Sequence, residues 1–341
     1  MSKSFHVAVL GATGAVGREF VNCLEERGFP VDKLTLLASP RSEGEKLEFK
    51  GEELTVRAVK PEHFQGVDLA FFSPGATVSN EWAPIATKAG ALVIDDSTAF
   101  RMDADVPLVV PEVNPDAILG ARPRGIVANP NCATIQMVLA LKPIHDAANL
   151  LRVVVSTYQA VSGRGQKGIQ ELEKQTGDLM NGRETETSAF PHRVAFNVVP
   201  QIDDFDDNGY TKEELRIVHE TRKILGIKDL RVSATAVRVP VFFGHSEAVN
   251  VTTEKKLTAA QARELLKAAP GLKVIDDPKA GIYPMPMLAA GDDCAHVGRI
   301  REDISQMNGL DFFVVADNIR KGAGLNAVQI AELLVQRGVL V

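Results

Sequence analysis

Apolar and polar residues follow two different patterns along the 341 residues of this chain. In the first part, short apolar runs alternate with amphipathic stretches, which predicts strands at residues 5–10, 33–38, 69–72, 92–95 and 126–128, and helices at 16–27 and 82–89. Strands that alternate with helices are typical of βαβ units. We therefore expect this part to fold around a mostly parallel sheet.

After residue 132 the apolar runs become longer and richer in valine. They predict strands at 151–159, 230–241 and 247–254, separated by polar helical segments at 168–179 and 211–225. This pattern indicates a second domain of the α+β class with a larger, largely antiparallel sheet.

The last segment, 324–337, is amphipathic and is followed by Gly338, a residue that often ends helices. Its apolar face needs a partner, and we expect it to return to the first domain. The predicted domains are therefore residues 1–131 with 322–341, and residues 132–321. The fold class is α/β, with the domain built on the parallel sheet first and the α+β domain second.

Composition narrows the classes of function. With 45% hydrophobic and 24% charged residues the chain is an ordinary globular protein. A net charge of −6 argues against nucleic acid as a partner, and no apolar run approaches the roughly 18 residues of a membrane helix. The first strand begins so early that it leaves no room for a signal peptide, so a cytoplasmic location is expected. The scattered His and Cys residues show no metal-ligand spacing, and no metal is expected.

Cys132 is the strongest candidate for chemistry. It follows Asn129-Pro-Asn131 directly and precedes a helical pattern, which places its thiol in the first turn of a predicted helix. Free backbone N–H groups and the helix dipole favour an anion there, and such a position lowers the pKa of a cysteine. The alternative is a small buried apolar residue, which is how we interpret Cys23.

A glycine-rich loop, Gly11-Ala-Thr-Gly-Ala-Val-Gly17, joins the first strand to the first helix. Glycines at such a turn let backbone amides approach a pyrophosphate at the helix N-terminus. The spacing is a variant of the usual dinucleotide fingerprint, and its place in a βαβ unit strengthens it.

The second predicted strand ends at Ala38-Ser-Pro-Arg-Ser42, without the acidic residue that typically holds the ribose hydroxyl of NAD. Hydroxyls and an arginine suit a 2′-phosphate, so we predict NADP. A polar surface turn is the alternative interpretation.

These motifs occur in the order found in one family. The chain resembles the aspartate-β-semialdehyde dehydrogenases along its whole length, in GATGAVG at 11–17, ASPRS at 38–42, STAFR at 97–101, NPNC at 129–132, QAVSG at 159–163, RVPV at 238–241, GHSE at 244–247 and LNAVQI at 325–330. The resemblance implies NADPH-dependent reduction of β-aspartyl phosphate to aspartate semialdehyde and phosphate, on the route to lysine, threonine and methionine. It also implies a Rossmann-type dinucleotide-binding domain at the N-terminus, and a catalytic domain that carries the interface of a homodimer.

The resemblance assigns catalytic roles to three residues: Cys132 as the nucleophile that forms a thioester, His245 as the general acid/base, and Gln159 as the residue that orients the substrate. Without the motif, a histidine at a strand end is more often structural. The other implied substrate contacts are Arg238 for the carboxylate, Arg101 for phosphate, Glu213 with Arg216 for the amino and phosphate groups, and Asn131. The implied cofactor contacts are Gly11, Thr13, Gly14, Ala15, Val16, Gly17, Ser39, Arg41, Ser42, Ser73, Gly75, Ser162, Gly163 and Asn326.

Three points remain open on the residues alone. Arg238 and His245 are seven positions apart, and odd offsets face opposite sides of a strand, so a bend has to bring them to one pocket. Glu213 and Arg216 could be an ordinary surface pair at helical spacing. The family usually has Lys where Arg216 stands and a small residue where Arg164 stands.

Three rival interpretations fit the residues less well. N-acetyl-glutamyl-phosphate reductase usually has Asn-Pro-Gly-Cys-Tyr around its thiol, and sugar-phosphate dehydrogenases have Ser-Cys-Thr-Thr-Asn; neither is present. A non-catalytic NADP-binding paralogue would have no reason to keep Cys132, His245, Arg238 and Gln159 together.

Overall fold

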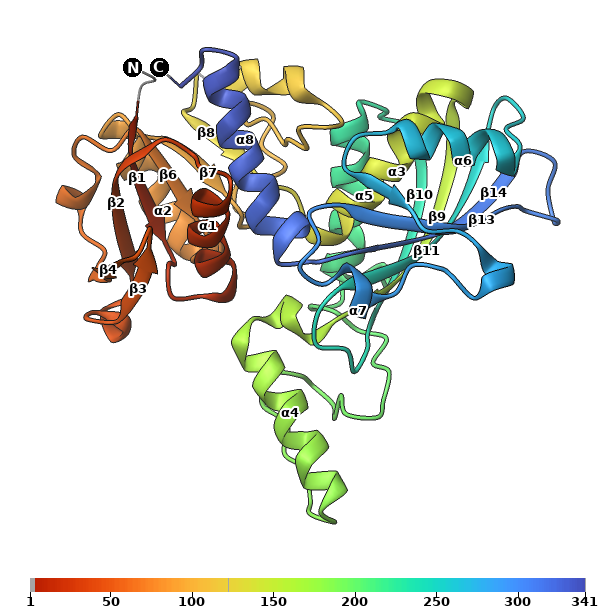
Figure 1. The fold of residues 1–341 in the computed structure, drawn as a ribbon, viewed down its shortest axis with the longest axis horizontal. Helices are drawn as coiled ribbons and strands as arrows, with labels where there is room; N and C mark the ends of the chain where they lie inside the picture. Colours follow the sequence, from red (N-terminus) through yellow and green to blue (C-terminus); the bar gives the residue numbers. More distant parts are fainter. Residues whose placement is uncertain (1–3, 122, 341) are drawn as a thin grey trace. The chain divides into compact units, whose positions relative to one another are not determined.

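The computed structural model describes residues 4–121 and 123–340, and the chain divides into two compact units. The first unit combines residues up to Asn131 with the C-terminal segment from Ala323, and the second runs from Cys132 to Gly322. The return to the first unit thus begins one residue later than the sequence pattern predicted. Figure 1 shows the path of the chain through both units.

The first unit is built on a parallel sheet with the strand order β5-β2-β1-β6-β7-β8. Its strands are β1 (Phe5–Leu10), β2 (Val31–Ala38), β5 (Arg57–Ala58), β6 (Leu69–Phe72), β7 (Leu92–Asp95) and β8 (Ile126–Ala128). A short hairpin, β3 (Lys46–Phe49) with β4 (Glu52–Thr55), was not predicted. The strands of the parallel sheet that were predicted are all present, because buried strands of such sheets read as continuous apolar runs.

Three helices belong to this unit: α1 (Ala15–Glu26), α2 (Ala76–Lys88) and α8 (Leu325–Gln336). Phe20 and Cys23 of α1 and Leu325 and Leu334 of α8 join one apolar core with the strands. Arg27 pairs with Glu332 and ties the two helices together. The apolar face of the last helix thus packs in the first unit, as its amphipathic pattern predicted, and Cys23 is packing material.

The strand order reverses between β1 and β6, because the chain runs outward from β1 to β2 and β5 and then returns to the other side. In open α/β sheets, ligands bind at the carboxyl ends of the strands at such a switch point. The loops that follow β1 and β6 are therefore the place to examine for a cofactor.

The second unit has a mixed sheet with the order β10-β9-β11-β14-β13-β12. Its strands are β9 (Leu150–Gln159), β10 (Arg231–Arg238), β11 (His245–Thr253), β12 (Leu272–Val274), β13 (Ala295–Glu302) and β14 (Gly309–Ala316). Only the β9–β10 and β12–β13 pairs are parallel, so the sheet is largely antiparallel, as expected. The last three strands were not predicted.

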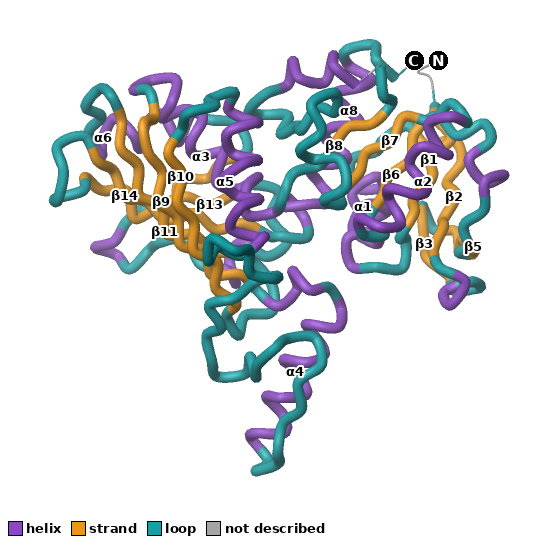
Figure 2. Tube along the Cα trace, turned by 180° about the vertical axis from the view of Figure 1, so that it is seen from behind, coloured by secondary structure: helices purple, strands orange, loops and turns teal. Residues whose placement is uncertain are grey.

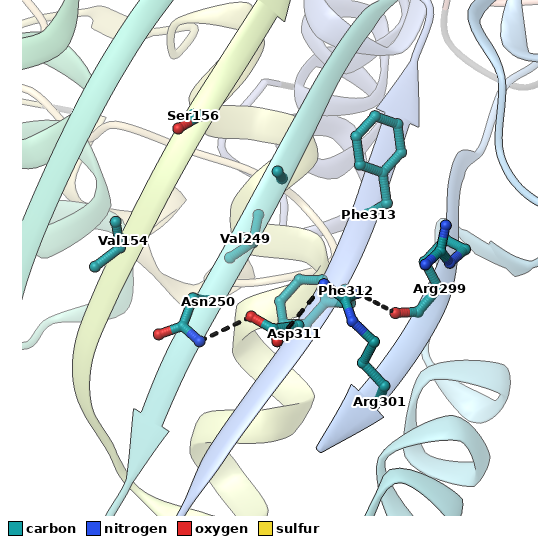
Figure 3. Close-up of a pocket in the computed structure, with 10 residues that line it drawn as sticks. Val154, Ser156, Val249, Asn250, Arg299, Arg301, Asp311, Phe312 and Phe313 are labelled. Atoms are coloured by element: carbon teal, nitrogen blue, oxygen red, sulfur yellow. Dashed lines mark hydrogen bonds and ion pairs between the residues drawn. The ribbon is translucent and has the colours of Figure 1, made fainter. Parts of the chain in front are cut away.

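Helices cover one face of this sheet: α3 (Cys132–Ala148), α5 (Lys212–Leu225) and α6 (Ala259–Ala268). Figure 2 shows them together on one side of the strands, and α7 (Pro286–Ala289) is a single short turn. Helix α4 (Gln166–Met180) and the loop after it project from the second unit as an arm (Figure 1). The other face of the sheet is open, with Ser156, Asn250 and Phe313 among the side chains on it (Figure 3).

Two predicted strand boundaries were wrong. The run 230–241 ends as a strand at Arg238, and the next strand starts at His245, so residues 239–244 form a turn and not a strand. Gly244 in this turn has a φ of +87°, a conformation that glycine adopts at little cost. Because Arg238 and His245 lie on different strands, the rule that odd offsets face opposite sides of one strand does not separate them.

No helix among the described residues is long and apolar enough to cross a membrane.

Candidate active site

Three predicted site residues meet at one edge of the second sheet. Gln159 is the last residue of β9, Arg238 is the last of β10, and the two are register partners. His245 begins β11, which is antiparallel to β9, so its start lies at the edge where β9 and β10 end. All three side chains are buried.

Cys132 is the first residue of α3, where the helix dipole favours an anion, as the sequence predicted. Its exposure is intermediate. A methyl group added to Gly322 would lie 2.9 Å from the Cβ atom of Cys132, so only glycine lets the chain pass this close to the thiol residue. The charge of a Cys132 thiolate also raises the pKa of Arg238, which places the two side chains in one electrostatic neighbourhood.

The imidazole of His245 is fully buried, and its Nδ1 atom accepts a hydrogen bond of 3.1 Å from the backbone N–H of Ala160. No hydrogen-bond partner for Nε2 is found among the described residues. Burial and, second, the charge of Arg238 lower the pKa of His245 well below 6.5. The ring is therefore neutral at physiological pH.

Arg238 is held on several sides. It donates from Nη1 to the carbonyl of Ala160 at 2.6 Å, and its Cζ atom lies 5.6 Å from the ring centroid of Phe190. Burial lowers the pKa of Arg238 to about 10, with Glu213 and Cys132 acting in the opposite direction and Arg164 adding to the decrease. The guanidinium therefore stays charged near neutral pH.

Glu213 links the substrate candidates of the second unit. It lies in the first turn of α5 and is buried, accepting from Gln159 Nε2 at 3.0 Å and from Arg216 Nη1 at 3.1 Å. Arg216 also pairs with Asp203, which lies in the loop before α5. Partial burial would raise the pKa of Asp203, but hydrogen bonds from Asp204 and Arg216 and the charge of Arg216 lower it. Hydrogen bonds and ion pairs thus connect the buried Gln159, through Glu213 and Arg216, to the more exposed Asp203.

Ser162 and Gly163 lie next to this group, in a single 3-10 turn after β9. Ser162 donates to Asn318 Oδ1 at 3.0 Å, and the same oxygen accepts from Gly244 N. A methyl group at Gly163 would lie 3.0 Å from Arg238 Nη1 and 3.2 Å from His245 Nε2. A side chain at position 163 would therefore crowd both Arg238 and His245.

In the first unit, the predicted cofactor residues collect after β1 and β6. A methyl group on Gly17 would lie 2.1 Å from the carbonyl oxygen of Gly11, and one on Gly11 would lie 2.9 Å from the backbone of Ser73. Gly14 and Gly75 are the N-caps of α1 and α2, and neither helix has a side-chain cap. Two helix N-termini at the switch point thus present backbone N–H groups, which suit a pyrophosphate. The N-terminal residues Ala15 and Val16 belong to the same turn.

The turn at the end of β2 joins this loop. Thr13 donates to Ser42 Oγ at 3.2 Å, and Pro40–Ser42 form one 3-10 turn with Ser39 as its N-cap. Arg41 is exposed on it, and the turn itself carries no acidic side chain. The residues present fit a dinucleotide with a 2′-phosphate.

Arg101 is a buried residue in the segment that follows β7. It donates to the carbonyl of Asp96 at 2.7 Å, while Ser97 donates to Asp95, whose second carboxyl oxygen accepts from Ser79. Burial raises the pKa of Asp95, although Ser79, Ser97 and Arg101 oppose the shift. Because its loop is fixed in this way, Arg101 has a defined position in the first unit.

Two of the predicted site residues, Asn326 and Asn131, are buried in the first unit. Asn326 is fully buried and donates to Asn129 Oδ1 and to the carbonyl of Val109, which holds the start of α8 against the end of β8. Its contact with a cofactor stays a prediction. Asn131, next to the thiol residue in sequence, is buried as the last residue of the first segment of unit one. Among the described residues no group of three or more His, Cys, Asp or Glu could hold a metal ion.

Comparison with known proteins decides the family. Residues 6–121 match the semialdehyde dehydrogenase NAD-binding domain, and residues 141–321 match the semialdehyde dehydrogenase dimerisation domain. An aspartate-semialdehyde dehydrogenase of Aquifex aeolicus is 57% identical over 98% of this chain and 99% of its own. This chain belongs to the aspartate-semialdehyde dehydrogenase family.

Solved structures of the aspartate-semialdehyde dehydrogenase family agree with the fold. The Vibrio cholerae aspartate semialdehyde dehydrogenase II complexed with ASA has a TM-score of 0.96 at 51% identity, covering 98% of this chain and 99% of that one. The Candida albicans enzyme with NADP has a TM-score of 0.77 at 26% identity, covering 99% of this chain and all of that one.

Sequence reasoning missed four contributors to the site of this family member. Phe190, Asp203 and Asn318 contact predicted residues from loops that carry no motif of their own. Gly322 lies in the Lys-Gly-Ala-Gly run before α8, and only that glycine pair signalled a close approach. No local pattern pointed to the other three.

Proposed function

We propose that this chain catalyses the reversible, NADPH-dependent reduction of L-aspartyl-4-phosphate to L-aspartate-4-semialdehyde and phosphate, on the route to lysine, threonine and methionine. The observation that carries the proposal is the convergence of Cys132, Arg238 and His245 in one unit of a member of this family. The first unit is assigned the NADP-binding role, and the second the catalytic and dimerisation roles.

Cys132 acts as the nucleophile in this proposal. Its thiolate attacks the acyl carbon, phosphate leaves, and a thioester remains on the sulfur. Bound NADPH supplies the hydride that reduces this thioester. His245 acts as the general acid/base at the carbonyl oxygen of the same thioester, and Gln159 orients the acyl group beside the thiol.

Substrate recognition follows from charge. Arg238 is a buried, protonated guanidinium of the type that binds a carboxylate through two parallel hydrogen bonds. The Glu213 carboxylate suits an ammonium group, and Arg216 and Arg101 suit phosphate oxygens. The relatives named for aspartate semialdehyde, and the Vibrio cholerae structure complexed with ASA, support this assignment.

The cofactor is assigned to the glycine loop and the turn after β2. Residues 11–17 with Ser73 and Gly75 are assigned to the pyrophosphate, and Ser39, Arg41 and Ser42 to the 2′-phosphate. Ser162, Gly163 and Asn326 are assigned to the nicotinamide end. The Candida albicans relative with NADP supports the choice of cofactor.

A homodimer is the assembly we propose, with the open face of the second sheet as the interface. Figure 3 shows Val154, Ser156 and Phe313 on this face, and Asn250 donates to Asp311 there. Tyr158, at an even position of β9 like Val154 and Ser156, is exposed on the same face. The dimerisation-domain match spans this sheet, which supports the assignment.

A cytoplasmic location is part of the proposal. A catalytic thiol has to stay reduced, which suits the reducing cytoplasm.

The deciding experiment measures NADP⁺ reduction by absorbance with L-aspartate-4-semialdehyde, with and without inorganic phosphate. We expect NADPH to form only when phosphate is present, and the Cys132→Ala variant to form none while still binding NADP. Phosphate-dependent turnover with N-acetyl-glutamate semialdehyde alone would move the chain to the rival reductase. If no NADPH formed with either aldehyde, the chain would be interpreted as a non-catalytic NADP-binding paralogue.

A further inference from the structure

Gln136 connects the helix that carries the nucleophile to strand β11. It lies on α3 four residues after Cys132, so the two positions share one face of the helix. Its Nε2 atom donates to the backbone carbonyl of His245 at 3.2 Å. Because a carbonyl oxygen only accepts, the amide nitrogen has to face His245, and Oε1 has to face another neighbour.

Glu247 is a buried acid on the same face of β11 as His245, two positions further along the strand. This is the face that α3 covers. The register partners of Glu247 are Thr157 on β9 and Val314 on β14, and neither forms a hydrogen bond with its carboxyl group. Burial raises the pKa of Glu247 well above 4.5, and the Gln136 side chain is close enough to oppose this shift. Gln136 is thus a polar neighbour with which Glu247 can pair.

Three buried oxygen atoms between α3 and β11 lack a hydrogen-bond donor. They are Gln136 Oε1 and the two carboxyl oxygens of Glu247, and no partner for any of them is found in the described part of the chain. Buried acceptors of this kind cost free energy unless they are paired. A proton on the Glu247 carboxyl group supplies the missing donor, because an acid O–H can donate to Gln136 Oε1. An ionised Glu247 would instead bury a charge and compete with the carbonyl of His245 for the N–H of Gln136.

From this geometry we propose that Glu247, as a neutral acid, donates a hydrogen bond to Gln136 Oε1 and so holds the amide whose N–H fixes the carbonyl of His245. Neither Gln136 nor Glu247 is assigned a contact with substrate or cofactor, so both are positioning residues. Together they hold the first residue of β11 against the first turns of α3. The inference rests on the proposed function, in which Cys132 as nucleophile and His245 as general acid/base act on one acyl group.

Two substitutions of Glu247 separate its hydrogen bond from its bulk. Methionine has a similar length but no donor, whereas glutamine keeps an N–H that can donate to Gln136 Oε1. We expect Glu247→Met to lower kcat roughly 10–10²-fold, the scale of loss when a catalytic group is slightly misplaced, with KM for aspartate semialdehyde nearly unchanged. Glu247→Gln should keep kcat close to that of the wild type. A normal kcat in Glu247→Met, or an equal loss in both folded variants, would overturn the inference.

A double-mutant cycle tests whether the two residues act as a pair. Gln136→Met should lower kcat at least as much as Glu247→Met, and adding Glu247→Met to it should cause no further loss, because the pair is already broken. Additive losses would contradict the pairing. Val251→Ala is the matched control, since Val251 is buried on the same face of β11 and has an apolar side chain. It should lower the free energy of unfolding without lowering kcat, and an equal loss of kcat would show that packing of the strand is responsible.

Infrared difference spectroscopy of the full-length protein tests the proton on Glu247 directly. The difference between the wild type and Glu247→Gln at neutral pH should contain the C=O stretching band of a protonated carboxylic acid. Gln136→Met should shift this band, because the acid loses its hydrogen-bond acceptor. Carboxylate bands in place of the acid band, or an acid band that Gln136→Met leaves unshifted, would overturn the inference. The measurement needs no turnover, so it decides the inference even if the proposed activity fails or Glu247→Met does not fold.

Discussion

Phe190 lies over the guanidinium of Arg238, with 5.6 Å between the ring centroid and Cζ. Hydrogen bonds connect the loop that carries Phe190 to the arm. The carboxylate of Glu171 on α4 accepts from the backbone N–H and the hydroxyl of Ser188 and from the backbone N–H of Ala189. Gln175 Oε1 accepts from the backbone N–H groups of Val194 and Ala195, further along the same loop. The arm therefore holds an aromatic face against the cation proposed to bind the substrate carboxylate.

Replacing Phe190 by Leu should weaken substrate binding, because the charged guanidinium loses a cation–π contact and a fixed wall. A cation–π contact at a desolvated site contributes about 2 kcal/mol, so we expect KM for aspartate semialdehyde to rise on the order of tenfold, with KM for NADP⁺ unchanged. Phe196→Leu, in the same loop but exposed, is the matched control. Equal effects of the two variants would show that loop folding, and not the Arg238 contact, is responsible.

Arg238→Lys changes the shape of the same cation. Lysine presents a point charge where arginine can form two parallel bonds with a carboxylate, and it cannot stack on Phe190 in the same way. We expect KM for aspartate semialdehyde to rise by at least about tenfold, since each 1.4 kcal/mol of lost binding corresponds to that factor. Steady-state kinetics at saturating NADP⁺ measure this. An unchanged KM would mean that another cation holds the carboxylate.

The sequence predicted most strands of the first unit, because they are buried and read as continuous apolar runs. It also predicted the glycine loop, because the close backbone approaches there leave no room for side chains. It also located Cys132 at a helix start, but it placed His245 after a strand, whereas His245 is the first residue of β11. It could not predict that Gln159 and Arg238 end neighbouring strands in register, since strand pairing depends on contacts between distant segments. Phe190, Asp203 and the Ala160 amide escaped for the same reason: they act through positions that only the folded chain brings together.

Arg41→Ala tests the cofactor assignment. Arg41 is exposed on the turn joined to the glycine loop, and its charge has no role in the apolar core of this unit. Loss of one charge-assisted bond to a 2′-phosphate, about 1.5–3 kcal/mol, should weaken NADP⁺ binding by roughly ten- to a hundredfold and leave NAD⁺ binding unchanged. Fluorescence titration of both cofactors measures the ratio. Parallel weakening of both would contradict the 2′-phosphate assignment.

Glu247 gives the protein a pH-dependent stability that should be separable from catalysis. Its side chain is 1% exposed, and burial raises its pKa well above 4.5, although the Gln136 amide acts in the opposite direction. Above pH 4.5 the unfolded chain has released this proton while the folded protein still holds it. The folded state then binds more protons, so its stability falls as pH rises from 4.5 through the folded pKa.

Glu247→Gln should remove that dependence, because glutamine has the shape of the protonated acid and cannot ionise. We expect the difference in free energy of unfolding between the variant and the wild type to move in favour of the variant as the pH rises above 4.5. Denaturant unfolding at mildly acidic and mildly alkaline pH measures the difference, and Glu173→Gln on the exposed face of α4 is the control. Parallel pH profiles for Glu247→Gln and the wild type would mean that Glu247 keeps an ordinary pKa in the folded protein.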